Sequence, residues 1–407
     1  MDRRPNLALQ QSLSIAFVAT CPPRQCGIAT FSSDLERALK AADRSVLIQW
    51  AAINEATSIH LYGPHVCWRI RQGDPDSYRS AANHLNAAAI DVVSLQHEFG
   101  LYGTWGDPFE DHLTPFLDVL EKPLVTTLHS VLPDPSASVC AAVRRIADRS
   151  ATLIVMAERA RSLLIHDYGI QPEQVNVIPH GVPPIQPHGR TRIKEQLDLT
   201  GRTLITTFGL VDPRKGLEYM IEAMQVVREQ DPTALYLIVG KTHPELVRRE
   251  GEAYRRQLLQ LVKDRGLQAH VEFVDEYLTQ AQIVEYLLAS DVYVTPYLDP
   301  QQITSGTLAY ALGAGKAIVS TPYPHAAEVV TRERGILVPF RSQSALAEST
   351  LRILGDPALK QSLEHAAYAY GRETAWPRVG QRTMAILRNA VVSTRANVPA
   401  LAAASGV

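Results

Sequence analysis

Short apolar runs alternate with helical patterns along almost the whole chain, and this alternation constrains the fold more than any other feature. The runs are rich in Val, Ile and Leu, and the stretches between them carry the apolar spacing of helices. Such alternation is typical of parallel sheets covered by helices on both faces. We expect strands at 14–20, 45–52, 91–97, 123–129, 152–157 and 174–180, and again at 203–209, 234–240, 270–275, 291–297, 317–321 and 335–340.

The chain is long enough for two such domains, because its 407 residues exceed the usual size of one. A segment rich in proline and polar residues lies near the middle, and the strand pattern restarts after it. We therefore predict two doubly wound, Rossmann-like α/β domains. Their predicted limits are 1–183 for the N-terminal domain, 184–200 for a linker and 201–372 for the C-terminal domain.

The C-terminal segment predicts a helix that begins or breaks at Pro377. Val379, Met384, Ile386 and Leu387 give it one apolar face. We expect this helix, 373–395, to dock back on the N-terminal domain. The remaining residues, 396–407, lack charge and periodicity and are predicted to be mobile.

Composition excludes several classes of protein. The hydrophobic fraction of 46%, the charged fraction of 20% and the net charge of −2 are those of a globular protein without an evident nucleic-acid surface. We see no signal peptide and no apolar run long enough to span a membrane, so we expect a cytoplasmic protein. Four cysteines are too few for a disulfide framework. Cys21 and Cys26 would need distant partners to bind zinc, so we expect no metal site.

A turn in the second half has the chemistry of a phosphate site. The segment "QQITSGTLAY" follows a predicted strand, and Thr304 or Ser305 is placed to cap the helix that begins there. Gly306 leaves room for a ligand to approach the backbone, and the free N–H groups of a helix start favour an anion. The alternative is an ordinary capped helix after a strand.

Adjacent cations follow another strand of the second half. "GLVDPRKG" places Arg214 and Lys215 after Gly209, just before a helix. Arg and Lys there can neutralise an anionic group such as a phosphate without proton transfer. A solvated basic turn is the alternative.

Polar residues also follow strands of the first half. Gly27 lies in the turn of "CPPRQCGIATF" and would let an acceptor or a phosphate approach the backbone. His97 and Glu98, in "QHEFGLYG", are the nearest approach to an acid–base pair in this half. His129 ends a strand in "TTLH", and His180 ends the last one. Each of them is equally compatible with a structural role in a turn or a packed strand end.

Five motifs in family order add to this interpretation. The segments "CGIATFSSDLERAL", "TTLHSVLPDP", "VIPHGV", "FGLVDPRKGLEYMIEAM" and "SGTLAYALGAGKAIVSTP" together resemble a retaining nucleotide-sugar glycosyltransferase of the GT-B fold, family 4 type. The resemblance implies two Rossmann-like domains with a deep interdomain cleft. It also implies that a nucleotide sugar binds mainly to the C-terminal domain and the acceptor to the N-terminal one.

The resemblance assigns roles to individual residues. His129, Arg214 and Lys215 would be catalytic. The expected donor and phosphate contacts are Gly27, Gly209, Gln302, Thr304, Ser305, Gly306, Thr307 and Tyr310; the nucleotide-base region would include Val274 and Tyr277, and the acceptor site His97, Glu98 and Tyr102.

The chain departs from the family at two of these positions. Gln302 and Tyr310 stand where the family carries a pair of glutamates that hold the donor sugar and the ribose. Leu210 also stands after Gly209 where the family usually has arginine.

Taken together, the sequence predicts a metal-independent hexosyltransferase that moves a sugar from a nucleotide diphosphate to a carbohydrate or other hydroxyl acceptor. With no well-placed carboxylate, the leaving phosphate would accept the acceptor's proton, and catalysis would rest on positioning and charge. No cofactor beyond the donor is expected. Two alternatives remain open, namely a glycoside phosphorylase that uses inorganic phosphate and a non-catalytic sugar-binding homologue. The loss of the ribose-binding glutamate at Tyr310 favours the first, and the changes at Gln302 and Tyr310 together favour the second.

Overall fold

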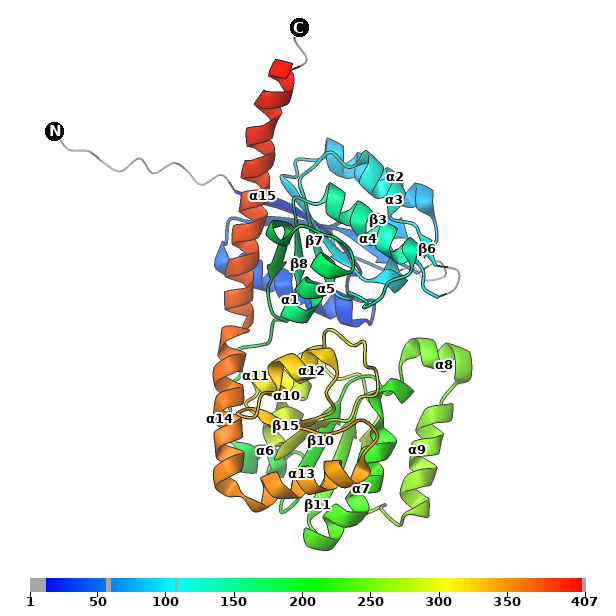
Figure 1. Cartoon of the computed structure of the whole chain (residues 1–407), viewed down its shortest axis with the longest axis vertical. Helices are drawn as coiled ribbons and strands as arrows, with labels where there is room; N and C mark the ends of the chain where they lie inside the picture. Colours follow the sequence, from blue (N-terminus) through cyan, green and yellow to red (C-terminus); the bar gives the residue numbers. More distant parts are fainter. Residues whose placement is uncertain (1–11, 56–59, 107–108, 405–407) are drawn as a thin grey trace, which may run out of the picture. The chain divides into compact units, whose positions relative to one another are not determined.

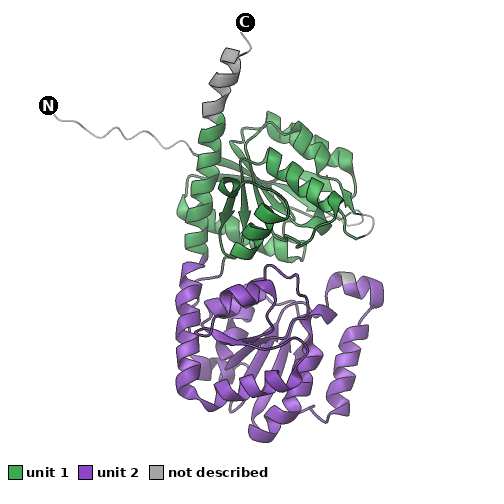
Figure 2. Ribbon diagram, in the orientation of Figure 1, with its two compact units in different colours: residues 1–181, 376–407 green, residues 182–375 purple. Residues whose placement is uncertain are grey.

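The computed structural model describes residues 12–55, 60–106 and 109–404, with side chains throughout except at 245 and 395–404. The chain forms two compact units (Figures 1 and 2). Unit 1 comprises 1–181 and 376–407, and unit 2 comprises 182–375. The chain therefore leaves unit 1 after Gly181 and returns to it at Trp376.

Unit 1 is a seven-stranded parallel sheet with the strand order β3-β2-β1-β4-β7-β8-β9. All six residues of β4 are buried, as expected for a parallel strand with helices on both faces. The strands are β1 (Ser14–Ala19), β2 (Leu47–Asn54), β3 (Val66–Arg71), β4 (Val92–His97), β7 (Leu124–Leu128), β8 (Thr152–Val155) and β9 (Val175–Val177). The α-helices are α1 (Gly27–Ala42), α2 (Pro75–Ala87), α3 (Thr114–Val119), α4 (Ala137–Arg149), α5 (Glu158–His166) and α15 (Trp376–Ala404). Shorter elements are η1 (Phe99–Leu101), η2 (Pro172–Gln174) and the antiparallel pair β5 (Gly103–Thr104) and β6 (Glu110–Asp111).

Unit 2 is a six-stranded parallel sheet with the order β12-β11-β10-β13-β14-β15. Its strands are β10 (Thr203–Phe208), β11 (Ala234–Val239), β12 (Val271–Val274), β13 (Val292–Thr295), β14 (Ala317–Ser320) and β15 (Gly335–Leu337). Its helices are α6 (Arg190–Gln196), η3 (Pro213–Lys215), α7 (Leu217–Gln230), α8 (Pro244–Glu250), α9 (Ala253–Asp264), α10 (Gln280–Ala289), α11 (Gly306–Gly313), α12 (Pro324–Val329), α13 (Gln343–Gly355) and α14 (Pro357–Glu373). Both units are doubly wound, Rossmann-like α/β structures, as predicted.

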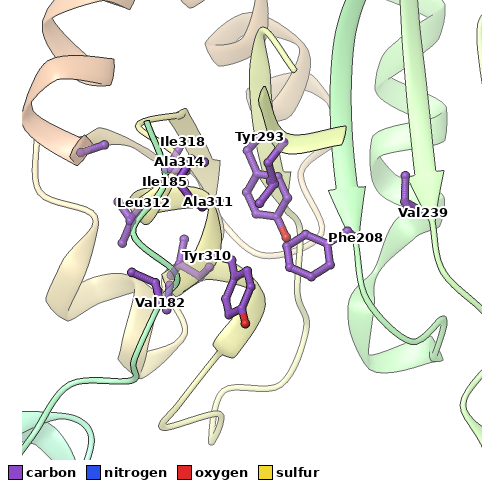
Figure 3. Close-up of a cluster of buried hydrophobic side chains, with 14 of the residues drawn as sticks. Val182, Ile185, Phe208, Val239, Tyr293, Tyr310, Ala311, Leu312, Ala314 and Ile318 are labelled. Carbon is purple, nitrogen blue, oxygen red and sulfur yellow. The ribbon is translucent and has the colours of Figure 1, made fainter. Parts of the chain in front are cut away.

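Side chains from strands and helices meet in the core of unit 2. Figure 3 shows Phe208 of β10, Tyr293 of β13 and Tyr310 of α11 in one buried cluster. The rings of Phe208 and Tyr310 lie 6.1 Å apart, centroid to centroid, in an edge-on arrangement. This contact holds α11 against the sheet close to the end of β10.

The prediction of a separate linker at 184–200 is wrong, because these residues belong to unit 2. The segment includes helix α6, and Ile185, Ile193 and Leu199 are buried in the core of unit 2. The proline and polar residues that suggested a linker lie between these apolar anchors, and burial of the anchors makes the segment part of the unit. The exchange of units occurs earlier, at Gly181.

The C-terminal helix α15 begins at Trp376, next to Pro377, and packs along α1 within unit 1. Trp376, Met384 and Leu387 are buried in the core of unit 1, and Arg388 pairs with Asp43 at 2.5 Å. The predicted span of 373–395 also takes in the last residue of α14 and the two-residue break at 374–375. The predicted mobile tail, 396–407, lies outside the residues whose side chains are described.

Strand order fixes where a ligand can bind in each unit. The order reverses between β1 and β4 in unit 1 and between β10 and β13 in unit 2. Loops that follow the two strands at such a reversal leave the sheet in opposite directions, and ligands bind at the carboxyl edge between them. The predicted site residues that follow β10 and β13 therefore belong to one place in unit 2.

We predict that Gly380→Ala destabilises unit 1 by about 1–3 kcal/mol, because overpacking forces a close contact apart. An added Cβ at Gly380 would lie 2.6 Å from the carbonyl oxygen of Ala38 in α1, so the two helices must separate. Gly100→Ala is the matched control, since a Cβ there meets no atom within 4 Å. All four tryptophans lie in unit 1, so urea unfolding followed by tryptophan fluorescence measures its stability. Equal stabilities of the two variants would contradict the close packing of α15 on α1.

Candidate functional site

The turn after β10 approaches the start of α11 closely. Gly209 has a φ of +126°, and its N–H donates to the carbonyl oxygen of Val239 at 2.9 Å. A Cβ at Gly209 would lie 3.0 Å from Cγ2 of Thr307, and one at Gly240 would lie 2.2 Å from the carbonyl oxygen of Gly209. Glycine is needed at 209 and 240 both for the backbone angles and for the space. The structure therefore brings Gly209 and Thr307 together, as predicted for the phosphate site.

Lys215 lies beside the same helix start. Its Nζ is 3.7 Å from the ring centroid of Tyr297, a cation–π contact worth about 0.5–2 kcal/mol. Tyr297 is fully buried, and its hydroxyl is 2.7 Å from Oγ1 of Thr307. The loop that carries Lys215 touches the loop of Tyr297 again where Leu298 N–H donates to the carbonyl oxygen of Arg214 at 2.8 Å. The ammonium group is thus held over a ring whose far end bonds to the first turn of α11.

Arg214 has a different environment from its neighbour. Its guanidinium donates to both carboxylate oxygens of Asp212 at 2.9 Å, and its side chain is 66% exposed. Burial raises the pKa of Asp212, but the hydrogen bonds from Arg214 outweigh it and hold that pKa below its usual value. In the described part of the chain no carboxylate lies within ion-pair distance of Lys215. Of the two predicted cations, Lys215 keeps the uncompensated charge.

Ser305 is the N-cap of α11. Its Oγ accepts a hydrogen bond from Leu308 N–H at 3.3 Å and lies 3.0 Å from Oγ1 of Thr307. Its own N–H donates to Nδ1 of His325 at 2.9 Å. The first turn that includes Gly306 is therefore fixed on both sides, and the N–H groups of a first helical turn have no partner within the helix. Such a turn is suited to an anion.

The two residues in the family's glutamate positions serve the protein itself. Gln302 is half-buried, and its Nε2 donates to the carbonyl oxygen of Thr304 at 3.2 Å. Tyr310 is 8% exposed, and its hydroxyl accepts from Nε2 of Gln280 at 2.8 Å. Gln302 lies just before the helix start, whereas Tyr310 is mainly a core residue.

The predicted nucleotide-base region is only partly connected to this place. Val274 ends β12, and its carbonyl oxygen accepts from Gly240 N–H at 2.8 Å, so it adjoins the turn at Gly209. Tyr277 is 43% exposed in the following loop. No hydrogen bond or ring contact in the described residues ties Tyr277 to Lys215 or α11.

A separate aromatic cluster lies at the carboxyl edge of unit 1. Phe31 of α1 contacts the ring of His129 edge-on at 4.7 Å between centroids, and those of His180 and Trp376 at 5.1 and 5.2 Å. Nε2 of His129 is 3.0 Å from Oε1 of Gln96. Burial lowers the pKa of His129 to about 3 and that of His180 to about 4, so both rings are neutral at neutral pH. A neutral ring is able to exchange a hydrogen bond with a sugar hydroxyl.

The turn before α1 is closed by a cysteine. Sγ of Cys26 accepts from Ala29 N–H at 3.3 Å and lies 3.0 Å from Oγ1 of Thr20. Gly27 is the first helical residue, and a Cβ there would meet no atom within 4 Å. Burial raises the pKa of the Cys21 thiol to about 12, which keeps it protonated and a poor metal ligand. Among the residues with described side chains, no group of three His, Cys, Asp or Glu is placed to hold a metal ion.

Two of the predicted acceptor residues are core residues, which is a correction. Tyr102 is 2% exposed, and its hydroxyl lies within hydrogen-bond distance of two carbonyl oxygens, those of Val18 and Gln96. His97 is 3% exposed and stacks on Tyr102, and burial lowers its pKa to about 3. Neither side chain has enough free surface to bind an acceptor. His97 ends β4, as the sequence predicted, whereas Tyr102 follows η1; packing turns both side chains inward.

Glu98 differs from these two residues because it is partly accessible. Its carboxylate accepts from Ser130 Oγ at 2.7 Å and from Phe99 N–H at 3.1 Å. Burial raises the pKa of Glu98, and these two hydrogen bonds oppose the rise. The expected acceptor role of Glu98 therefore stays a prediction.

Sequence reasoning missed four residues that organise these places, namely Phe31, Gln96, Tyr297 and His325. Tyr297 and Gln96 stand in predicted strands, where their polar tips could have drawn attention. His325 lies twenty residues beyond the helix cap that it bonds, and no local pattern connects them.

We predict that unit 1 loses stability as the pH falls below about 6.5, because the unfolded chain then binds protons that buried His129 does not bind until about pH 3. The free energy of unfolding should keep falling from about pH 6.5 to about pH 3, because in this range the unfolded chain binds a proton at His129 that the folded chain does not. His129→Gln should make the slope of unfolding free energy against pH shallower by up to about 1.4 kcal/mol per pH unit. Urea unfolding followed by tryptophan fluorescence between about pH 4.5 and 6 measures the slope. His166→Gln changes an exposed histidine of the same unit and should keep the wild-type slope. An unchanged slope in His129→Gln would contradict a buried neutral ring.

Comparisons with known proteins agree with this geometry. Residues 189–372 match the family model described as Glycosyl transferases group 1, and 27–185 match that described as Glycosyltransferase Family 4. The D-inositol 3-phosphate glycosyltransferase of Jonesia denitrificans is 24% identical over 300 residues, which is 68% of each chain.

Two solved structures share the fold. Sucrose-phosphate synthase from Thermosynechococcus elongatus matches with a TM-score of 0.73 at 19% identity, over 94% of this chain and 100% of its own. HepE of Anabaena, crystallised with UDP and glucose, matches with a TM-score of 0.72 at 16% identity, over 93% of this chain and 100% of its own. Together with the two parallel α/β units, these likenesses show the GT-B fold. Because the two family matches cover most of the chain between them, it belongs to the family 4 type of GT-B-fold glycosyltransferases and is an enzyme of that class.

Proposed function

We propose that the chain transfers a hexose from a nucleotide-diphosphate sugar to a hydroxyl acceptor, with retention of configuration and without a metal ion. The observation that carries the proposal is Lys215, held over the ring of Tyr297 beside the first turn of α11. An ammonium group and a helix start that face the same place complement a diphosphate. Both come from the loops that follow β10 and β13, where the strand order reverses.

The donor class rests on two supports besides this geometry. HepE, which shares the fold, was crystallised with UDP and glucose. Gly209 and Gly240 also leave the backbone after β10 bare, which lets a phosphate approach it closely. Neither Gln302 nor Tyr310 carries a charge, so we assign recognition of the donor sugar and ribose to neutral hydrogen bonds.

The reaction follows from the charges at this place. As the sugar–phosphate bond breaks, negative charge grows on the leaving phosphate, and Lys215 stabilises that charge more strongly than it stabilises the intact donor. Asp212, the carboxylate in this loop, is occupied by Arg214 and is held ionised by it. We therefore assign the proton of the attacking hydroxyl to the leaving phosphate oxygen, on the same face of the sugar. Attack on that face retains the configuration.

The acceptor is assigned to unit 1. His129 is neutral, partly accessible and held by Gln96 and Phe31, so it is suited to bond a sugar hydroxyl without adding charge. Glu98, beyond the neighbouring strand, is the second group that we assign to this role.

We predict that Lys215→Ala lowers the rate about 10²–10³-fold, or roughly 2.7–4 kcal/mol, by analogy with the loss of one preorganised oxyanion donor. Arg214→Ala should cost much less, because Asp212 already compensates that charge. The two variants are matched, since they remove adjacent cations of one loop. Release of nucleoside diphosphate from a panel of nucleotide sugars, with and without candidate acceptors, measures the rate.

A larger loss in Arg214→Ala than in Lys215→Ala would contradict the assignment of the cation. The same assay run with inorganic phosphate and disaccharides, but no nucleotide, detects phosphorolysis. Phosphate-dependent cleavage of disaccharides without activity on any nucleotide sugar would overturn the proposed donor.

A further inference from the structure

A charged cavity lies in unit 2, at the edge of the sheet opposite to the candidate site. Its volume is about 310 Å³, and it lies between the loop before α6, helix α14 and the turn before β14. Lys316 immediately precedes β14, and Asp291 immediately precedes β13, so both stand at the amino edge of the parallel sheet. The lining used below comprises His188, Arg190, Lys316, Glu364, His365 and Tyr368, and we call it the amino-edge pocket.

Three cations gather behind this pocket around one buried carboxylate. Asp291 is 7% exposed and pairs with Lys194 at 2.5 Å, with Lys360 at 2.8 Å and, more distantly, with Arg190 at 3.7 Å. Burial raises the pKa of Asp291, but Lys360 and Lys194 outweigh burial and lower that pKa to about 2. The carboxylate is therefore ionised at any ordinary pH, and it is shared among more cations than it neutralises.

Arg190 carries charge from this group into the pocket. Its guanidinium also pairs with Glu364 at 2.5 Å, and its buried Nε has no hydrogen-bond partner. The guanidinium of Arg190 can therefore donate a further hydrogen bond in addition to its ion pairs with Asp291 and Glu364. An unsatisfied buried donor is costly, and a ligand that accepts from it recovers the cost.

Lys316 adds a fourth cation on the pocket wall. It is 2% exposed, and its Nζ lies 3.2 Å from the carbonyl oxygen of Ser290 and 3.5 Å from that of Leu288. Burial and, to a smaller extent, the charges of Arg190 and Lys360 lower the pKa of Lys316 to about 7, against the opposing effect of Glu364 and Asp291. Four cations thus face two carboxylates, and the ammonium lacks an anion of its own.

We propose that the amino-edge pocket binds the phosphate group of a small phosphate monoester. Arg190 and Lys316 would hold the phosphate, because both present donors and neither is fully compensated. The cavity is larger than a bare phosphate needs and is within the size of small-molecule sites, so it also takes an organic part. His188, His365 and Tyr368 line the space for that part with two imidazole rings and a phenol ring, all of which can form hydrogen bonds. This ligand differs from the donor in place, since its pocket adjoins the amino edge of the sheet and the donor the carboxyl edge.

Proton uptake is the first signature of this site. A dianion beside Lys316 raises its pKa, so binding at about pH 8 should draw a proton onto the neutral amine of Lys316 and convert it to the ammonium form. Other charged or titratable groups also surround Lys316. They are Arg190 and Lys194 on α6, Asp291 just before β13, Lys360 and Glu364 on α14, and the lining residues His188, His365 and Tyr368. Calorimetry in two buffers of different ionisation enthalpy measures the uptake. Sulfate is the companion probe, because it does not itself titrate at this pH.

The test uses the full chain with Lys215→Ala, so that the candidate active site contributes less to phosphate binding. Glucose 6-phosphate, inorganic phosphate and sulfate are titrated separately, with a nucleoside diphosphate present in a second series. We expect the phosphate monoester to bind most tightly, with proton uptake and without competition from the nucleoside diphosphate. Equal affinity for all three probes would overturn the assignment of an organic part. Competition by the nucleoside diphosphate would overturn the separate location.

Two further variants localise the binding. Lys316→Met keeps the buried stem and removes the ammonium, and should weaken binding by about tenfold or more and abolish the proton uptake. His365→Glu places a carboxylate on an exposed position of α14, so folding is spared, and the like charge should weaken binding similarly, while His365→Gln is its neutral control. Failure of all three probes to bind, or unchanged affinity in both Lys316→Met and His365→Glu, would overturn the proposal.

Discussion

The reversal of strand order between β10 and β13 is the constraint on which the arrangement of unit 2 depends. Because neighbouring strands there send their following chains in opposite directions, the loop with Lys215 and the loop with Tyr297 meet above the carboxyl edge. The cation–π contact and the Tyr297–Thr307 hydrogen bond then join both loops to α11. Each group is held by its neighbour, so this arrangement is preorganised for the phosphate that we propose to bind there.

The two edges of this sheet handle charge differently. At the carboxyl edge Arg214 is matched by Asp212, and the charge of Lys215 is left over. At the amino edge a single carboxylate, Asp291, is surrounded by cations, and Lys316 is buried nearby with only carbonyl oxygens within bonding distance. An excess of positive charge at each end of one sheet is uncommon for structural reasons alone, since a buried cation without an anion costs free energy.

Sequence patterns predicted the architecture because parallel strands bury both faces and so appear as continuous apolar runs. β3 was missed for the same reason, since "VCWRIR" is mostly half-buried or exposed and lacks such a run. The capped start of α11 and the glycine turn after β10 were predictable because N-caps and glycines are local signals. The roles of His97 and Tyr102 were not predictable, because whether such a side chain faces inward or outward is decided by packing partners such as Val18, which lies 84 residues before Tyr102.

Tyr310 shows how a lost ligand can become a structural residue. In the family resemblance this position carries a glutamate for the ribose, but here the ring packs edge-on against Phe208 (Figure 3). Its hydroxyl accepts a hydrogen bond from Gln280. A carboxylate in the same place would lose its water among apolar neighbours unless a ligand or a cation compensated it. The tyrosine avoids that cost and stiffens α11, which also presents Thr307 and the capped turn. At the position that the resemblance assigns to ribose, the chain thus has a side chain that fixes the helix whose start lies beside Lys215.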